Sequence, residues 1–170
     1  KWIRSRSEEW GIDPAKVGIA GFSAGGHLAS TVSTHFDSGK SGTTDRLEQY
    51  SSRPDFQILF YPVISMESKY GHGGSCRQFL GERATEELKK EFSNEYQVDS
   101  LTPRAFIALS DDDRGVVPMN SIRYYSALKE KEIPAAMYIY PSGGHGWGMK
   151  DSFKFRNEML MELKAWLMTF

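Results

Sequence analysis

The chain has 170 residues, of which 21 are Lys or Arg and 22 are Asp or Glu, giving a formal net charge of −1. This length accommodates one domain with a proper core, and the balanced charge disfavours nucleic acid as the main partner. The single cysteine in the sequence, Cys76, excludes an internal disulfide framework, and no apolar run is long enough to span a membrane.

The first fifty residues predict a helix, a buried strand and a second helix. The chain begins at Lys1, inside an amphipathic stretch over residues 2–10 that predicts a helix ended by Gly11. The apolar run from Val17 to Gly21 lacks alternation, as expected of a strand buried on both faces of a parallel sheet. A helix over about residues 24–36 follows directly. The polar residues 37–52 then predict a surface loop.

The middle of the chain predicts a second strand and a long insertion. Residues 56–61 are mostly apolar and are stopped by Pro62, which predicts the second strand. Residues 65–102 follow no regular pattern and contain a Gly-rich loop at 71–74 and a short charged helix around 85–92. We interpret this segment as an insertion that lies over the edge of the sheet.

The last third of the chain predicts two more strands, each followed by a helix. The strands are expected at residues 105–109 and 136–140, and the helices at 119–131 and 151–170. The last helix carries an apolar residue about every fourth position: Phe155, Met159, Leu163 and Leu167. Strands separated by helices form parallel βαβ units with right-handed crossovers. The sequence therefore predicts an α/β fold in one domain over residues 1–170, with helices on both faces of a parallel sheet.

A candidate nucleophile stands at the end of the first strand. The stretch Gly21-Phe22-Ser23-Ala24-Gly25 fits the pattern G-x-S-x-G, at a point where a buried strand turns directly into a helix. Glycines permit so tight a turn, which presents Ser23 at the carboxyl end of the strand and aims the Ala24 N–H at a developing oxyanion. The alternative is a serine that only caps an ordinary turn.

Partners for this serine follow the later strands. A serine hydroxyl is a weak nucleophile and needs a base that a third group holds in place. The order Ser, Asp, His along the chain is the one expected for this motif. His145 follows the fourth strand and has glycines on both sides, and the acid is one of Asp111, Asp112 and Asp113 after the third strand. These residues alone leave the choice of acid open.

The remaining histidines favour structural roles. His27 stands four residues after Ser23, and we interpret it as a packing or hydrogen-bonding residue, whereas His35 and His72 are expected at the surface. His72 and Cys76 lack further ligands at the spacing that zinc requires. The sequence therefore predicts neither a metal site nor an organic cofactor.

Three segments together resemble the esterase/lipase branch of the α/β-hydrolases, and within it bacterial acetylxylan-esterase-like proteins. The resemblance rests on residues 21–29, on residues 113–118 with Asn120-Ser121, and on Gly144-His145-Gly146. Prolyl-oligopeptidase-type peptidases share the pattern D-x-x-V-V-P. In both groups the acid stands three residues before the first Val, so the resemblance implies Asp113, and a slip of one residue would select Asp112. It also favours an extracytoplasmic location, which the residues themselves leave unknown.

The chain departs from this family before the nucleophile. Members carry an H-G-G-type loop whose backbone N–H groups complete the oxyanion hole, and no segment upstream of Ser23 matches it. The early strands of the family's sheet are also expected to be missing. We therefore expect the C-terminal portion of a hydrolase sheet, whose strand from Val17 to Gly21 has an exposed edge that favours self-association.

The resemblance implies two-step acyl transfer by Ser23, His145 and Asp113. The implied substrate is a small acyl ester such as acetyl on a xylan-type sugar. Trp147 and Tyr70 are candidates for the walls of its pocket, although both residue types are as common in cores. Two alternatives remain: a serine peptidase, and an inactive hydrolase-fold module that serves as a binding surface.

Overall fold

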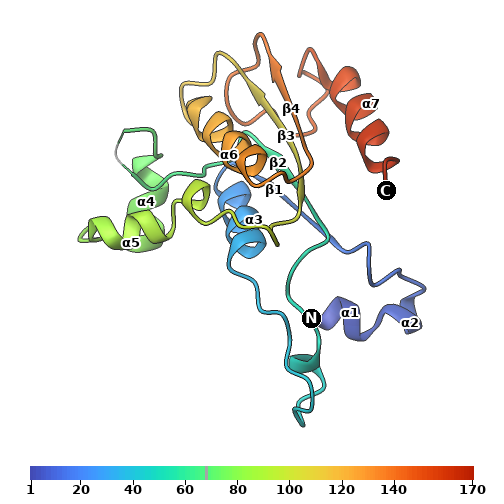
Figure 1. Cartoon of the computed structure of the whole chain (residues 1–170). Coiled ribbons are helices and arrows are strands. Elements are labelled where there is room, and N and C mark those ends of the chain that lie inside the picture. Colours follow the sequence, from blue (N-terminus) through green and yellow to red (C-terminus); the bar gives the residue numbers. More distant parts are fainter. Residues whose placement is uncertain (68) are drawn as a thin grey trace.

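The computed structural model describes residues 1–67 and 69–170, and its centre is a parallel sheet (Figure 1). Its four strands are β1 (Gly18–Phe22), β2 (Phe56–Phe60), β3 (Arg104–Ser110) and β4 (Ala135–Tyr140), in the order β1-β2-β3-β4. The register places Gly21 beside Leu59, and Leu59 beside Ile107. The predicted α/β class and the four predicted strands are confirmed.

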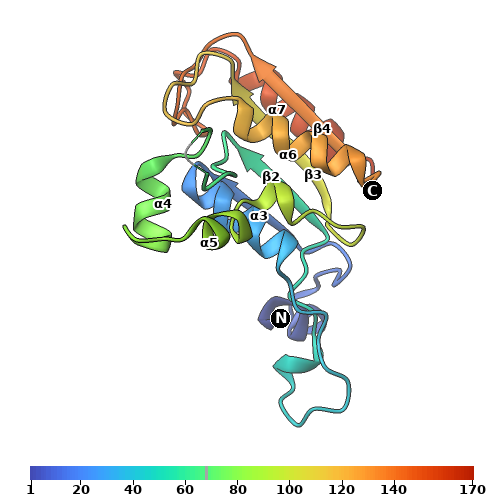
Figure 2. The ribbon, with the colours of Figure 1, turned by 60° about the vertical axis from the view of Figure 1, so that its left-hand side comes forward.

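Helices cover both faces of this sheet, as predicted. The helices α3 (Ala24–Thr34) and α6 (Met119–Glu130) lie on one face, and α7 (Arg156–Leu167) lies on the other (Figures 1 and 2). In α7, Met159 is fully buried, and Leu163 and Leu167 pack against the same core. The apolar repeat therefore identified the buried side of this helix, although the helix begins five residues later than predicted. Among the described residues, no helix has the length and apolar character that crossing a bilayer requires.

The strands differ in burial, and β1 is the exception to the sequence-based expectation. All residues of β3 after Arg104 are buried. In β1, by contrast, Ile19 is half-buried and Phe22 is 38% exposed. The expectation that this strand is buried on both faces is therefore wrong for the described chain. The reason is its position, because within residues 1–67 and 69–170 β1 pairs with β2 alone, at the edge of the sheet.

The amino-terminal stretch forms two short helices rather than the single helix predicted. They are α1 (Trp2–Ser5) and α2 (Ser7–Trp10), and they are separated by Arg6, whose φ of −112° and ψ of 8° lie outside the helical region. The stretch ends at Gly11 in the left-handed conformation, as predicted.

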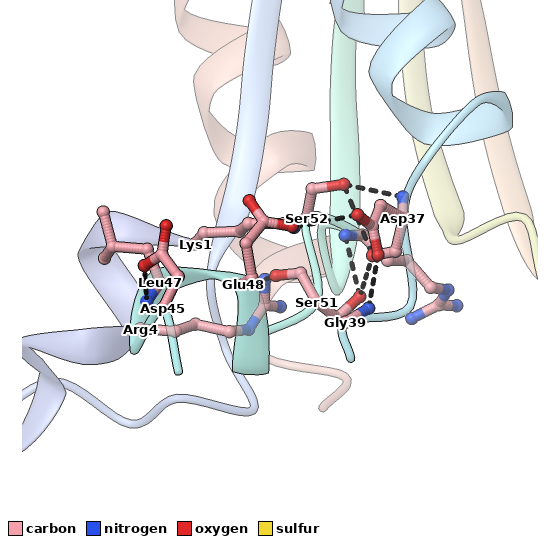
Figure 3. Close-up of polar contacts among 10 residues, drawn as sticks. Lys1, Arg4, Asp37, Gly39, Asp45, Leu47, Glu48, Ser51 and Ser52 are labelled. Carbon is pink, nitrogen blue, oxygen red and sulfur yellow. Dashed lines mark hydrogen bonds and ion pairs between the residues drawn. The ribbon is translucent and has the colours of Figure 1, made fainter. Parts of the chain in front are cut away.

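Charged side chains tie this end of the chain to the loop of residues 37–52 (Figure 3). Lys1 Nζ lies 2.8 Å from both the Asp37 and the Glu48 carboxylates. Arg4 donates to the Ser51 carbonyl and pairs at 2.7 Å with Asp55, the residue just before β2. The predicted surface loop, which contains the short helix η1 (Leu47–Gln49), is therefore held at several points.

The insertion between β2 and β3 packs on helices, not over the edge of the sheet as expected. It contains α4 (Gly73–Leu80), α5 (Glu86–Glu91) and η2 (Asn94–Tyr96), and η2 contacts both α3 and α6. Its anchor is polar, since Asn94 Nδ2 donates to Ser30 Oγ at 2.7 Å, and the His27 Nε2 lies 2.8 Å from the Phe92 carbonyl oxygen. Polar groups of α3 therefore hold the insertion in place, and the interpretation of His27 as a hydrogen-bonding residue is borne out. Figure 2 shows the insertion helices α4 and α5 beside α3.

Candidate active site

Ser23 occupies a strained turn between β1 and α3. Its φ of +53° and ψ of −120° are rare for a residue with a side chain. The turn is held from β2, because Ser23 N–H donates to the Phe60 carbonyl and Val63 N–H donates to the Ser23 carbonyl, both at 3.0 Å. Strain that the surrounding structure maintains is typical of functional turns. This turn presents Ser23 Oγ at the carboxyl end of the sheet.

The two glycines of the G-x-S-x-G pattern contribute unequally to this turn. A Cβ atom on Gly21 would lie 2.1 Å from the Gly25 carbonyl oxygen. Because this oxygen belongs to the backbone, it cannot move aside as the end of a flexible side chain could. A Cβ atom on Gly25 would meet nothing within 4 Å. The steric requirement that the sequence suggested for both glycines therefore applies to Gly21 and not to Gly25.

Ser23, His145 and Asp113 form one chain of hydrogen bonds. Ser23 Oγ lies 2.7 Å from His145 Nε2, and His145 Nδ1 lies 2.7 Å from Asp113 Oδ2. The imidazole is 30% exposed, whereas the Asp113 side chain is completely buried. A carboxylate only accepts hydrogen bonds, so it favours the tautomer with the proton on Nδ1. Nε2 then presents its lone pair to the serine hydroxyl.

The three consecutive aspartates have different surroundings. Asp113 Oδ1 accepts hydrogen bonds from the N–H groups of Gly115 and Val116, so both oxygens of this carboxylate are engaged. Asp112 Oδ1 accepts from Gly144 N–H at 2.8 Å and thereby braces the residue before His145. Asp111 is exposed. The structure brings Asp113, and not Asp112, to the imidazole.

The segment that carries His145 is shaped by glycines and anchored by aromatic rings. Gly144 and Gly146 have φ values of +59° and +80°, which residues with side chains rarely adopt. Trp147 is 4% exposed, donates to Ser110 Oγ and stacks on Phe153 at 4.0 Å between ring centroids. Trp147 therefore belongs to the core, and it also lines a small cavity of about 260 Å³ together with His145.

Sequence reasoning missed Tyr61, the first residue after β2. Its ring centroid lies 4.8 Å from that of His145, and its hydroxyl accepts a hydrogen bond from Gly148 N–H. Burial is the main reason that the pKa of this phenol lies above its ordinary value. The sequence does show that an apolar run ends at Tyr61-Pro62, which places Tyr61 at the end of a predicted strand. It does not show in which direction the ring of Tyr61 points.

A groove begins beside the nucleophile. Ala24, the first residue of α3, lines a mostly apolar groove of about 650 Å³ between α3 and α4. The first N–H groups of a helix have no partner within the helix, so the Ala24 N–H is free to donate a hydrogen bond to a ligand oxygen. The predicted pocket wall Tyr70 does not line this groove. Its ring instead lies 5.2 Å from the guanidinium of Arg123.

The remaining histidines have structural surroundings. His27 is buried, and desolvation lowers the pKa of its imidazole, so the neutral form is favoured. His72 caps the start of α4, where its Nδ1 accepts from Ser75 N–H, and His35 is exposed. Within residues 1–67 and 69–170, no three metal-ligating side chains converge.

Comparison with known proteins places the chain in a family. The model of the BD-FAE family matches residues 1–128. The chain belongs to the BD-FAE family. It is 42% identical over 169 residues to an acetylxylan esterase of Xylanibacter ruminicola, with 97% of this chain and 33% of that protein covered. It is also 40% identical over 146 residues to endo-1,4-beta-xylanase B of Butyrivibrio fibrisolvens, with 86% and 23% covered.

Solved structures of similar proteins confirm the fold of this BD-FAE member. An acetyl ester-xyloside bifunctional hydrolase from Caldicellulosiruptor lactoaceticus superposes with a TM-score of 0.95 at 39% identity, covering 99% of this chain and 61% of the relative. A carboxylesterase from Lactobacillus plantarum superposes with a TM-score of 0.75 at 24% identity, covering 98% of this chain and 63% of that chain. The suspected α/β-hydrolase relationship is confirmed. The chain spans about a third or less of the curated relatives it matches.

Proposed function

We propose that this chain carries the catalytic residues of a serine carboxylic-ester hydrolase. The observation that supports this proposal is the chain of two 2.7 Å contacts from Ser23 Oγ through His145 to Asp113, built on a strained turn at the end of a parallel strand. Such a constellation activates a hydroxyl that is otherwise a weak nucleophile.

The reaction has two steps. Ser23 Oγ attacks the ester carbonyl while its proton moves to His145 Nε2, and the new oxyanion accepts a hydrogen bond from Ala24 N–H. Collapse of the tetrahedral intermediate breaks the bond to the alcohol oxygen, which takes the proton from Nε2 and leaves an acyl group on Ser23. Water then attacks this acyl-enzyme with the same proton transfers. Asp113 stabilises the imidazolium that forms in each step.

The proposed substrates are small acyl esters of carbohydrate, with acetyl on xylan as the leading example. Support comes from the names of two relatives at 42% and 39% identity, an acetylxylan esterase and an acetyl ester-xyloside hydrolase. Further support is the groove lined by Ala24, the residue that follows the nucleophile, which offers space for part of a substrate.

Replacement of the nucleophile tests this function. Ser23→Ala is expected to lower the turnover of p-nitrophenyl acetate and the release of acetate from acetylated xylan by on the order of 10⁴-fold or more. The matched control is Ser33→Ala, which removes a buried serine hydroxyl at the other end of α3 and leaves the turn intact. Turnover of a proline-directed peptide in place of the esters would favour a peptidase. Retention of ester turnover in Ser23→Ala would refute the assignment of the nucleophile.

A further inference from the structure

Tyr61 combines a strained backbone with a central position in the site. It follows β2, the strand that lies between the one leading to Ser23 and the one leading to Asp113. Its φ is +36°, its side chain is buried, and its N–H donates to the Ala108 carbonyl at 2.7 Å. A residue other than glycine in this region costs on the order of 1–3 kcal/mol and persists where its surroundings require it.

Both parts of the Tyr61 side chain contact the segment that carries His145. The ring stands edge-on to the imidazole, with an interplanar angle of 66° and ring centroids 4.8 Å apart. The hydroxyl lies 2.8 Å from the N of Gly148, three residues further along. One side chain thus limits the space in which the imidazole can turn and also fixes the backbone that supports it.

A core-filling role does not account for this arrangement. Trp147 already anchors the same segment in the core through Ser110 and Phe153. The Tyr61 hydroxyl instead meets the segment that carries His145, at the N–H of Gly148. Since burial raises the pKa of the phenol, the hydroxyl stays neutral and remains available as a partner at physiological pH.

We propose that Tyr61 is a positioning residue that holds the His145 imidazole in line between Ser23 Oγ and the Asp113 carboxylate. This role rests on the proposed function of the three residues. It acts through geometry, since a displacement of about 1 Å in a catalytic group can lower the rate of the chemical step by on the order of 10²-fold.

Two substitutions separate the contributions of the ring and the hydroxyl. Tyr61→Phe keeps the ring but removes the partner of Gly148 N–H, and we expect kcat to fall by roughly 3- to 10-fold with little change in KM. Tyr61→Leu also removes the ring, and we expect kcat to fall by on the order of 10²-fold. The matched control is Tyr124→Phe, because the Tyr124 hydroxyl is fully buried, donates to Gln57 Oε1 and makes no contact with His145.

Two further measurements separate positioning from a purely structural role: the stability of each variant and the proton NMR signal of the His145 imidazole. Tyr61→Phe and Tyr124→Phe each lose one tyrosine hydrogen bond, so a purely structural role predicts comparable losses of stability in these two variants and no separate effect on kcat. The second measurement is the proton resonance of His145 Nδ1–H, whose low-field position reports the hydrogen bond to Asp113. We expect this signal to broaden or shift in Tyr61→Leu and to remain unchanged in Tyr124→Phe.

The outcomes distinguish this proposal from the proposed function. If the unaltered protein shows no Ser23-dependent ester turnover, the proposed function fails, and the Nδ1 resonance still decides whether Tyr61 positions the imidazole. If turnover depends on Ser23 but both Tyr61 variants retain the kcat and the Nδ1 resonance of the unaltered protein, the positioning role is overturned while the proposed function stands.

Discussion

At the scale of single residues, Asp113 and Asp112 differ in how many hydrogen bonds their carboxylates accept. Asp113 accepts from two backbone N–H groups and contacts the imidazole, so it cannot turn away without leaving the buried Val116 N–H unpaired. Asp113→Asn retains the shape but can donate to Nδ1, which favours the wrong tautomer. We expect its kcat for p-nitrophenyl acetate to fall by on the order of 10⁴-fold.

The adjacent position supplies the control for this prediction. Asp112→Asn keeps an oxygen that can accept from Gly144 N–H, so its kcat should stay within roughly threefold of the unaltered protein. A large loss in Asp112→Asn together with a small loss in Asp113→Asn would move the role of triad acid to Asp112.

A second prediction at this scale concerns His27 and pH. Burial lowers the pKa of His27 in the folded protein, whereas the unfolded chain takes up this proton near pH 6.5. Below that pH the unfolded state therefore binds more protons, and the free energy of unfolding should fall with falling pH by up to about 1.4 kcal/mol per unit. His27→Gln, whose amide can still donate to the Phe92 carbonyl, should reduce this dependence.

Urea unfolding at pH 7.5 and 5.5 measures the effect, and His35→Gln is the control because His35 is exposed and stacks on the ring of the same Phe92. Equal pH dependence in the His27→Gln protein and the unaltered one would show that other groups cause the acid sensitivity.

At the scale of elements, the junction of β1 and α3 depends on one glycine more than on the other. Gly21→Ala places a Cβ 2.1 Å from the Gly25 carbonyl oxygen, and we expect it to destabilise the fold by on the order of 3 kcal/mol or more. Gly25→Ala places its Cβ in open space within a helix, and we expect stability to be unchanged or to rise by up to about 1 kcal/mol. Urea unfolding of both variants compares them directly, and equal destabilisation would contradict this steric account.

Local patterns explain why much of the fold could be predicted from the sequence. The strands were located to within about a residue because their apolar runs end at a glycine, a proline or a charged residue. Ser23 was located because its motif lies at the junction of a predicted strand and a predicted helix. The helix α4 was missed because its first residues, Gly73 and Gly74, are poor helix formers and because His72, which caps it, is not a preferred N-cap residue.

Long-range contacts explain what the sequence could not provide. The placement of Trp147 in the core depends partly on its hydrogen bond to Ser110, which lies on β3. The contact of Tyr61 with His145 spans more than eighty residues and leaves no periodic pattern in the chain. The position of the insertion depends on polar contacts of α3, which a pattern of apolar residues does not reveal.

At the scale of the whole molecule, the carboxyl ends of all four strands supply the candidate site. The segments after β1, β3 and β4 carry Ser23, Asp113 and His145, and the residue after β2 is Tyr61. Parallel strands place all these ends at one edge of the sheet, which is where open α/β sheets bind ligands. The site therefore depends on the alignment of the whole sheet and not on any single loop.

The two strands at the edges of this sheet are β1 and β4. We predict that the 170-residue chain self-associates through β1. Among the described residues, β1 pairs on one side only, and Gly18, Ala20 and Gly21 would let another backbone approach closely. β4 also lies at an edge, but its Met137, Tyr138 and Ile139 are bulky. An unprotected strand edge with small side chains is prone to pair with a second chain. We therefore expect a concentration-dependent dimer in sedimentation velocity experiments.

Lysine substitutions identify which edge is used. Ala20→Lys places a charge on β1 at an exposed position and should shift the chain toward monomer, because charged side chains protect strand edges from pairing. Ala15→Lys makes the same change in charge at an exposed residue outside the strand and should leave the dimer intact. Ile139→Lys makes the corresponding change on β4, where Ile139 is 41% exposed. Loss of the dimer in Ile139→Lys alone would transfer the contact to β4, and a monomer at every concentration would refute self-association through either edge.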